Sequence, residues 1–146
     1  MMKIDLEKHT FDYGKVVSNP SASENGRSFT LLNNSKYCVR RWSIDKEVFK
    51  DRKEERCDFL IEVQKNKNTY YWIELKGKDL TKACSQMLNT LKLVDTTNAV
   101  VQEARIITSG TNKIDIRTIE YQRLNRLMSE TGGRLRQYTN QGTETI

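Results

Sequence analysis

The sequence contains few of the residues that build metal-bound or cross-linked scaffolds. Its 146 residues include one histidine and one proline, and the three cysteines, Cys38, Cys57 and Cys84, lie far apart with no CxxC pair. This spacing argues against a structural zinc site and against a disulfide framework. We therefore expect reduced cysteines, most of them in the core of a cytoplasmic protein.

Long apolar runs are absent as well. No stretch approaches about 18 apolar residues, so no membrane-spanning helix is expected, and MMKIDLEKHTFDYGKVV at the N-terminus shows no apolar segment of a secretion signal. Charged residues make up 30% of the chain and hydrophobic residues 36%, which predicts a modest core that still suffices to order a domain. The formal charge of +6 weakly favours a polyanionic partner.

Residues 1–28 are expected to be irregular, because residues 18–28 (SNPSASENGRS) are rich in Ser, Asn and Gly and carry the only proline. A single domain then covers residues 29–146. Within it, β-branched and aromatic residues predict strands over 37–44, 57–63, 69–75 and 103–110. Residues 29–34 fit a strand or a helical turn, and residues 135–146 fit an edge strand or a tail.

Two helices are expected between and after these strands. Apolar residues recur every three or four positions from Leu80 to Val94, with Asp79 as a plausible N-cap. The second helix lies within 116–133 and stops at a glycine pair. The order predicts an α/β protein with a mixed sheet: three antiparallel strands, a crossover helix, a further strand parallel to the third, and a C-terminal helix.

The hairpin over residues 57–76 brings acidic residues together. A turn centred on Asn66 predicts three pairs: Phe59 with Ile73, Ile61 with Tyr71, and Asp58 with Glu74. Facing carboxylates repel each other unless a cation lies between them. Lys76 follows Glu74 by two residues and so projects from the same face. Oxygen ligands from Asp58 and Glu74 suit Mg²⁺ or Mn²⁺.

The segment CDFLIEV-QKNKN-TYYWIELKGKD resembles the PD-(D/E)XK nuclease superfamily, which has the restriction-endonuclease-like fold, and the resemblance covers roughly residues 37–110. The match consists of Asp58, the E-x-K element Glu74-Leu75-Lys76, and Gln86 on the following helix. The resemblance implies that Asp58, Glu74 and the Leu75 carbonyl hold Mg²⁺ or Mn²⁺. It also implies that Lys76 assists the attacking water and that Gln86 orients the water or the lysine.

Two positions depart from the family pattern. Cys57 precedes Asp58 where the family often has proline. The acidic residue that the family usually carries on its first core helix has the candidates Glu24 and Glu7, and neither lies in a clear helical pattern.

The resemblance implies a Mg²⁺-dependent endonuclease that acts on nucleic acid, with DNA favoured over RNA. Structure-selective cleavage, as in small Holliday-junction resolvases of this superfamily, is compatible with a homodimer. The basic residues expected to contact nucleic acid are Arg40, Arg41, Arg56, Lys78, Arg123 and Arg126. Two alternatives stay open: a catalytically inactive module of the same fold that binds nucleic acid or protein, and an unrelated α/β domain whose hairpin mimics the motif. Trp72, on the face of Glu74, either packs under a helix or stacks on a base.

Overall fold

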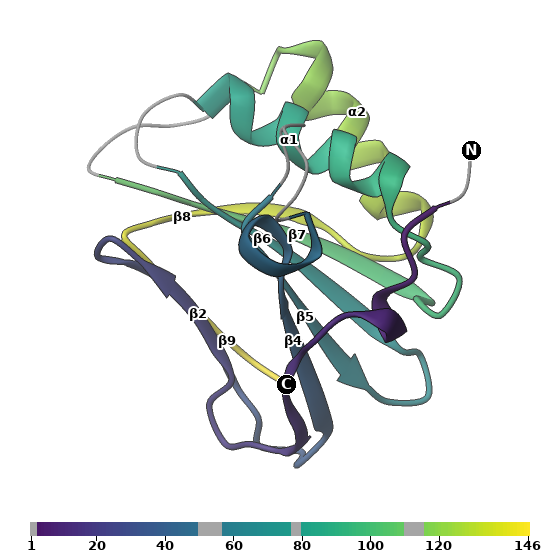
Figure 1. Ribbon diagram of the computed structural model, residues 1–146. Helices are drawn as coiled ribbons and strands as arrows, with labels where there is room; N and C mark the ends of the chain where they lie inside the picture. Colours follow the sequence, from purple (N-terminus) through teal and green to yellow (C-terminus); the bar gives the residue numbers. More distant parts are fainter. Residues whose placement is uncertain (1–2, 50–56, 77–79, 110–115) are drawn as a thin grey trace.

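The computed structural model describes residues 3–49, 57–76, 80–109 and 116–146 and has a layered arrangement (Figure 1). The strands are β1 (Asp12–Val16), β2 (Ser21–Glu24), β3 (Arg27–Leu32), β4 (Cys38–Ser43), β5 (Phe59–Gln64), β6 (Thr69–Lys76), β7 (Val101–Thr108), β8 (Leu135–Thr139) and β9 (Gln141–Thr145). The helices are α1 (Leu80–Leu93) and α2 (Ile119–Glu130), with short helical turns η1 (Leu6–Lys8) and η2 (Ile44–Val48).

The larger sheet is mixed, as the sequence predicts. Its strand order is β1-β4-β5-β6-β7-β8, with antiparallel pairing from β1 to β6 and parallel pairing from β6 to β8. Helix α1 connects β6 to β7, and α2 connects β7 to β8, because parallel neighbours need a crossover connection. A smaller sheet of order β2-β3-β9 forms a separate layer.

The predicted register of the central hairpin is confirmed. Phe59 pairs with Ile73, and Ile61 pairs with Tyr71. A slip of one residue would turn every side chain of the strand to the opposite face, so the alternating pattern specifies this register strongly.

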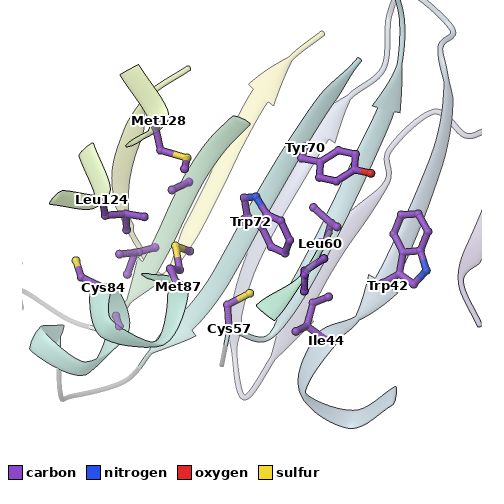
Figure 2. Close-up of a cluster of buried hydrophobic side chains, with 14 of the residues drawn as sticks. Trp42, Ile44, Cys57, Leu60, Tyr70, Trp72, Cys84, Met87, Leu124 and Met128 are labelled. Carbon is purple, nitrogen blue, oxygen red and sulfur yellow. The ribbon is translucent and has the colours of Figure 1, made fainter. Parts of the chain in front are cut away.

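Apolar residues cover both faces of β5 and β6. On the helix side, Leu60 and Trp72 belong to one buried cluster with Met87 of α1 and Leu124 of α2 (Figure 2). On the other side, the smaller sheet covers a second cluster, which consists of Ala22, Phe29, Leu31, Val39, Ile61, Val63, Tyr71, Ile73, Leu75 and Ile107. Trp72 therefore packs under helices, and the face that carries Glu74 belongs to the core.

The irregular N-terminal segment predicted for residues 1–28 was wrong for β1 and β2. Strand β1 pairs with β4, and β2 forms a hairpin with β3. The turn of that hairpin contains Asn25 and Gly26, both with positive φ (51° and 79°). Asn-Gly is the preferred sequence for a tight turn of this kind. The stretch that was expected to be a loop therefore forms the β2–β3 hairpin.

The structure also decides the two segments for which the sequence left alternatives. Residues 29–34 belong largely to strand β3, and residues 135–146 form two strands, each in a different sheet. Helix α1 ends at Leu93, whereas its predicted cap Asp79 lies outside the described residues. In the part of the chain that the structure describes, no helix is long and apolar enough to cross a membrane.

Candidate functional site

Asp58 lies directly before β5, outside its ladder with β6. Its backbone N–H donates to the Ile73 carbonyl (3.1 Å), and its side-chain Oδ2 accepts from the Leu75 N–H (2.8 Å). The predicted direct pairing with Glu74 is therefore not part of the ladder. Instead, the Asp58 carboxylate replaces a backbone acceptor for β6, which fixes it beside the E-x-K element.

The carboxyl groups of Asp58 and Glu74 are close enough to interact. Burial raises the pKa of Asp58, a hydrogen bond from the Leu75 N–H opposes that shift, and the charges of Glu24 and Asp45 add to it. A hydrogen bond with Glu74 lowers the pKa again, but the net direction is upward. Glu74 itself is only 2% exposed. Two carboxyl groups in this position favour a cation or a shared proton between them.

Glu24 is the upstream acidic candidate that the fold brings to the site. It ends β2 and pairs with Lys46 (3.3 Å), and its charge acts on Asp58. Glu7, in contrast, forms two hydrogen bonds with Arg40 (2.7 and 2.8 Å). Glu24 thus reaches the site from a strand of the smaller sheet, where the family resemblance predicts a helix.

Helix α1 is anchored to the segment in front of Asp58. The buried Cys57 N–H donates to Thr90 Oγ1 (2.9 Å), and the Thr90 hydroxyl donates to the Gln86 carbonyl (2.8 Å). Burial raises the pKa of the Cys57 thiol, and the charges of Glu74 and Asp58 add to that shift. The face of α1 that carries Gln86 and Thr90 therefore lies next to both carboxylates.

Gln86 has unused hydrogen-bonding capacity. Its Oε1 is buried and has no hydrogen-bond partner among the described residues. A buried amide oxygen without a partner costs free energy, so such groups often mark a site for a ligand or a water.

The donor set fits a cation that keeps several of its waters. Among the described residues, no group of three or more His, Cys, Asp or Glu side chains is arranged to hold a metal ion. Mg²⁺ is commonly held by one or two carboxylates together with water and phosphate, which Asp58 and Glu74 can supply. The N–H and C=O of a strand residue point to the same side. Because the Leu75 N–H donates to Asp58, its carbonyl faces the same direction.

The expected nucleic-acid residues of β4 are engaged within the protein. Arg40 pairs with Glu62 (2.7 Å) as well as Glu7, and it lies over the Trp42 ring. Arg41 pairs with Asp12 (2.6 Å). These contacts attach the N-terminal segment to β4, so they have a structural role.

The other basic candidates differ from this pair. Arg123 and Arg126 lie exposed on α2, where neither forms an ion pair with a described residue. Arg56 and Lys78 lie outside the described residues. Lys76 is the last residue of β6, and its backbone is paired with Thr108 of β7.

Two contributors were missed by sequence reasoning. Asp45 acts on Asp58 from η2, whose first residue, Ile44, donates its N–H to the Asp58 carbonyl (2.9 Å). Lys46 meets Glu24. Both lie in a charged stretch without a motif, and only the tertiary fold brings them to the carboxylates.

Comparisons of the chain with protein-family models, with curated proteins and with solved structures found no match. The resemblance to the nuclease superfamily therefore rests on the sequence motif alone.

Proposed function

We propose that the protein is a metal-dependent phosphodiesterase that cleaves DNA, a Mg²⁺-dependent endonuclease with a restriction-endonuclease-like core. The observation that supports this most is the pair of adjacent carboxyl groups, Asp58 and Glu74, beside the Leu75 backbone. Burying two such groups together is costly for a fold without a ligand. A divalent cation between them would offset that cost.

The order of elements around the pair supports the same proposal. Strands β4, β5 and β6 form an antiparallel meander, α1 crosses over, and β7 returns parallel to β6. This is the order that the superfamily resemblance implies. Asp58 directly precedes the second strand of the meander, Glu74 comes from the third, and Gln86 comes from the crossover helix.

Each residue then has a defined role. Asp58, Glu74 and the Leu75 carbonyl would hold Mg²⁺ or Mn²⁺, which when bound lowers the pKa of a water and neutralises charge on the phosphodiester. Lys76 would assist the attacking water. Gln86, whose Oε1 is buried without a partner among the described residues, would orient that water. Arg123 and Arg126, which form no ion pair with a described residue, offer guanidinium groups to phosphates.

A cleavage assay tests the proposal. Labelled single-stranded, duplex and four-way-junction DNA is incubated with the protein in Mg²⁺, Mn²⁺ or EDTA. We expect cleavage only with metal, and loss of about 100-fold or more in rate for Lys76→Ala and for Glu74→Gln. Lys67→Ala, in the turn between β5 and β6, is the matched control and should cleave normally. Absence of cleavage by folded protein, together with no metal binding by calorimetry, would contradict the proposal.

The alternative is a catalytically inactive module of the same fold that binds nucleic acid or protein. It is favoured because no group of three or more His, Cys, Asp or Glu side chains among the described residues is arranged to hold a metal ion. Such a module would bind DNA equally well with Mg²⁺ or EDTA, and Glu74→Gln would leave its affinity unchanged. Measuring DNA binding and cleavage on the same samples separates the two functions.

A further inference from the structure

A cavity of about 400 Å³ is lined by residues of α1 and α2, together with Lys3, Thr96 and Gln102. Its apolar wall consists of Leu88, Leu91, Leu127 and Met128. Leu127 is 38% exposed, so this wall of the cavity is accessible to solvent. Cavities of this size with mostly apolar walls are typical of sites for small organic molecules.

This cavity is separate from the carboxylate site. With 3.6 residues per turn, Leu88, Leu91 and Lys92 lie on the side of α1 opposite to Gln86 and Thr90. The carboxylates therefore lie under one side of the helix and the cavity lies beside the other.

Three cations surround the apolar wall, and each comes from a different part of the chain. Lys92 lies near the C-terminal end of α1, Arg123 belongs to α2, and Lys3 belongs to the N-terminal segment. That segment is attached to the end of α1, because the Ile4 N–H donates to the Leu93 carbonyl (2.7 Å). None of the three cations forms an ion pair with a described residue.

One carboxylate, Glu130, also lines the cavity, so the lining keeps an excess of positive charge. An apolar wall with an excess of cations at its rim is complementary to a molecule with an apolar body and one negative group. The apolar body would contact the leucines and exclude water from them. The negative group would pair with Lys92, Arg123 or Lys3.

We propose that this cavity between α1 and α2 binds a small amphipathic monoanion, namely a free carboxylate with a short aliphatic or aromatic body. Binding there does not require the metal or the carboxylates of the proposed nuclease site. Arg123 also belongs to the surface proposed to contact phosphate, but the inference does not depend on metal binding or on cleavage.

A titration followed by ¹⁵N-resolved NMR tests this proposal with octanoate as the probe. Octan-1-ol provides the same body without charge, and acetate provides the head without the body. We expect saturable octanoate binding, with shifts centred on Leu88, Leu91, Lys92 and Leu127. Octan-1-ol and acetate should each bind about tenfold more weakly or worse, since each lacks one of the two contributions.

Substitutions then locate the site. Lys92→Glu, at an exposed position, should weaken octanoate binding about tenfold and leave octan-1-ol unaffected. Leu127→Gln should weaken both. Lys67→Glu makes the same charge change in the β5–β6 turn and should change neither. Equal binding of octan-1-ol and octanoate to the wild type, shifts centred elsewhere, or no effect of Lys92→Glu would overturn the proposal.

Discussion

At the scale of single residues, Asp58 has an environment that opposes its own ionisation. It is half-buried, and Glu24, Asp45 and Glu74 surround it with further carboxyl groups. One bond favours the present arrangement, the 2.8 Å hydrogen bond that Oδ2 accepts from Leu75. A neutral amide could keep that bond without the charge. The charged aspartate therefore makes the folded protein less stable than a neutral amide would, which is common for functional residues.

Asp58→Asn should stabilise the protein at neutral pH. The pKa of Asp58 is raised in the folded state, so the folded protein holds this proton more tightly than the unfolded chain does. Stability is then lost as pH rises from the unfolded pKa through the folded one. Asparagine does not titrate, and we expect a gain of roughly 0.5 to 2 kcal/mol in the free energy of unfolding at pH 7. Urea denaturation at neutral pH and at about pH 3, where both states are protonated, measures the difference.

Asp95→Asn is the control for this pH dependence. The side-chain and backbone hydrogen bonds from Thr97 lower the pKa of the exposed Asp95. Its substitution should therefore act in the opposite direction or not at all. A loss of stability at pH 7 for Asp58→Asn, or a gain of equal size at both pH values, would show that burial of the charge is not the dominant effect.

At the scale of elements, the contact between α1 and the start of β5 depends on one hydroxyl group. Thr90 is fully buried and accepts from the Cys57 N–H while it donates to the Gln86 carbonyl. Among the described residues, this is the hydrogen bond that joins residues 57–58 to α1. Helix position and carboxylate position are therefore coupled through Thr90.

Thr90→Val should break this coupling with almost no change of shape. It leaves the buried Cys57 N–H without its acceptor, which costs about 1 to 3 kcal/mol in the free energy of unfolding. Thr90→Ser keeps the hydroxyl and should retain the hydrogen bond. If the link positions Asp58, Thr90→Val should also weaken Mg²⁺ binding in calorimetry, and Thr90→Ser should not. Equal metal affinity in the two variants would limit Thr90 to a structural role.

The element scale also shows what the sequence could predict. The pairs Phe59–Ile73 and Ile61–Tyr71 were predictable, because alternation and the turn length fix a local hairpin. Helix α1 was predictable because its apolar residues recur every three or four positions from Leu80 onward, which is also a local pattern. Asp58 departed from its predicted pairing because its side chain, rather than its backbone, bonds to β6.

The N-terminal strands were not predictable from local pattern alone. Strand β1 is largely exposed and pairs with a β4 strand that follows more than twenty residues later. Strand β3 has neighbours from both ends of the chain, since β2 precedes it and β9 comes from the C-terminus. Glu24 and Asp45 reach Asp58 only through this long-range pairing, so periodicity could not identify Asp45 at all.

At the scale of the whole molecule, a buried ion pair connects the two sheets. Arg105 of β7 is 2% exposed and bonds through Nε and Nη2 to the carboxylate of Glu144 in β9 (2.6 and 3.0 Å). Tyr138 of β8 donates to the same carboxylate (2.6 Å). Strand β9 lies parallel to β3 in the smaller sheet. The larger sheet is thus linked to the layer that also carries Glu24.

Glu144→Gln should loosen this link and remove part of the acid sensitivity of the fold. Burial raises the pKa of Glu144, but hydrogen bonds from Arg105 and Tyr138 outweigh it and lower the pKa overall. The stability that this group contributes is therefore present above the unfolded pKa and lost as pH falls through the folded one. We expect a loss of about 1 to 3 kcal/mol at pH 7, because Arg105 keeps its charge in a buried position with Glu103 as its remaining carboxylate partner (3.0 Å).

Urea denaturation of Glu144→Gln and the wild type at pH 7 and at about pH 3 checks this expectation. The gap between the two proteins should narrow as pH falls through the folded-state pKa of Glu144, because the carboxyl group then loses the charge that pairs with Arg105. Glu47→Gln, an exposed position in η2, should show no gap at either pH. A gap that stays constant with pH would mean that shape, not charge, holds β9 in place. Narrowing would instead show that the ion pair connects the two sheets, and so supports the layer that brings Glu24 to Asp58.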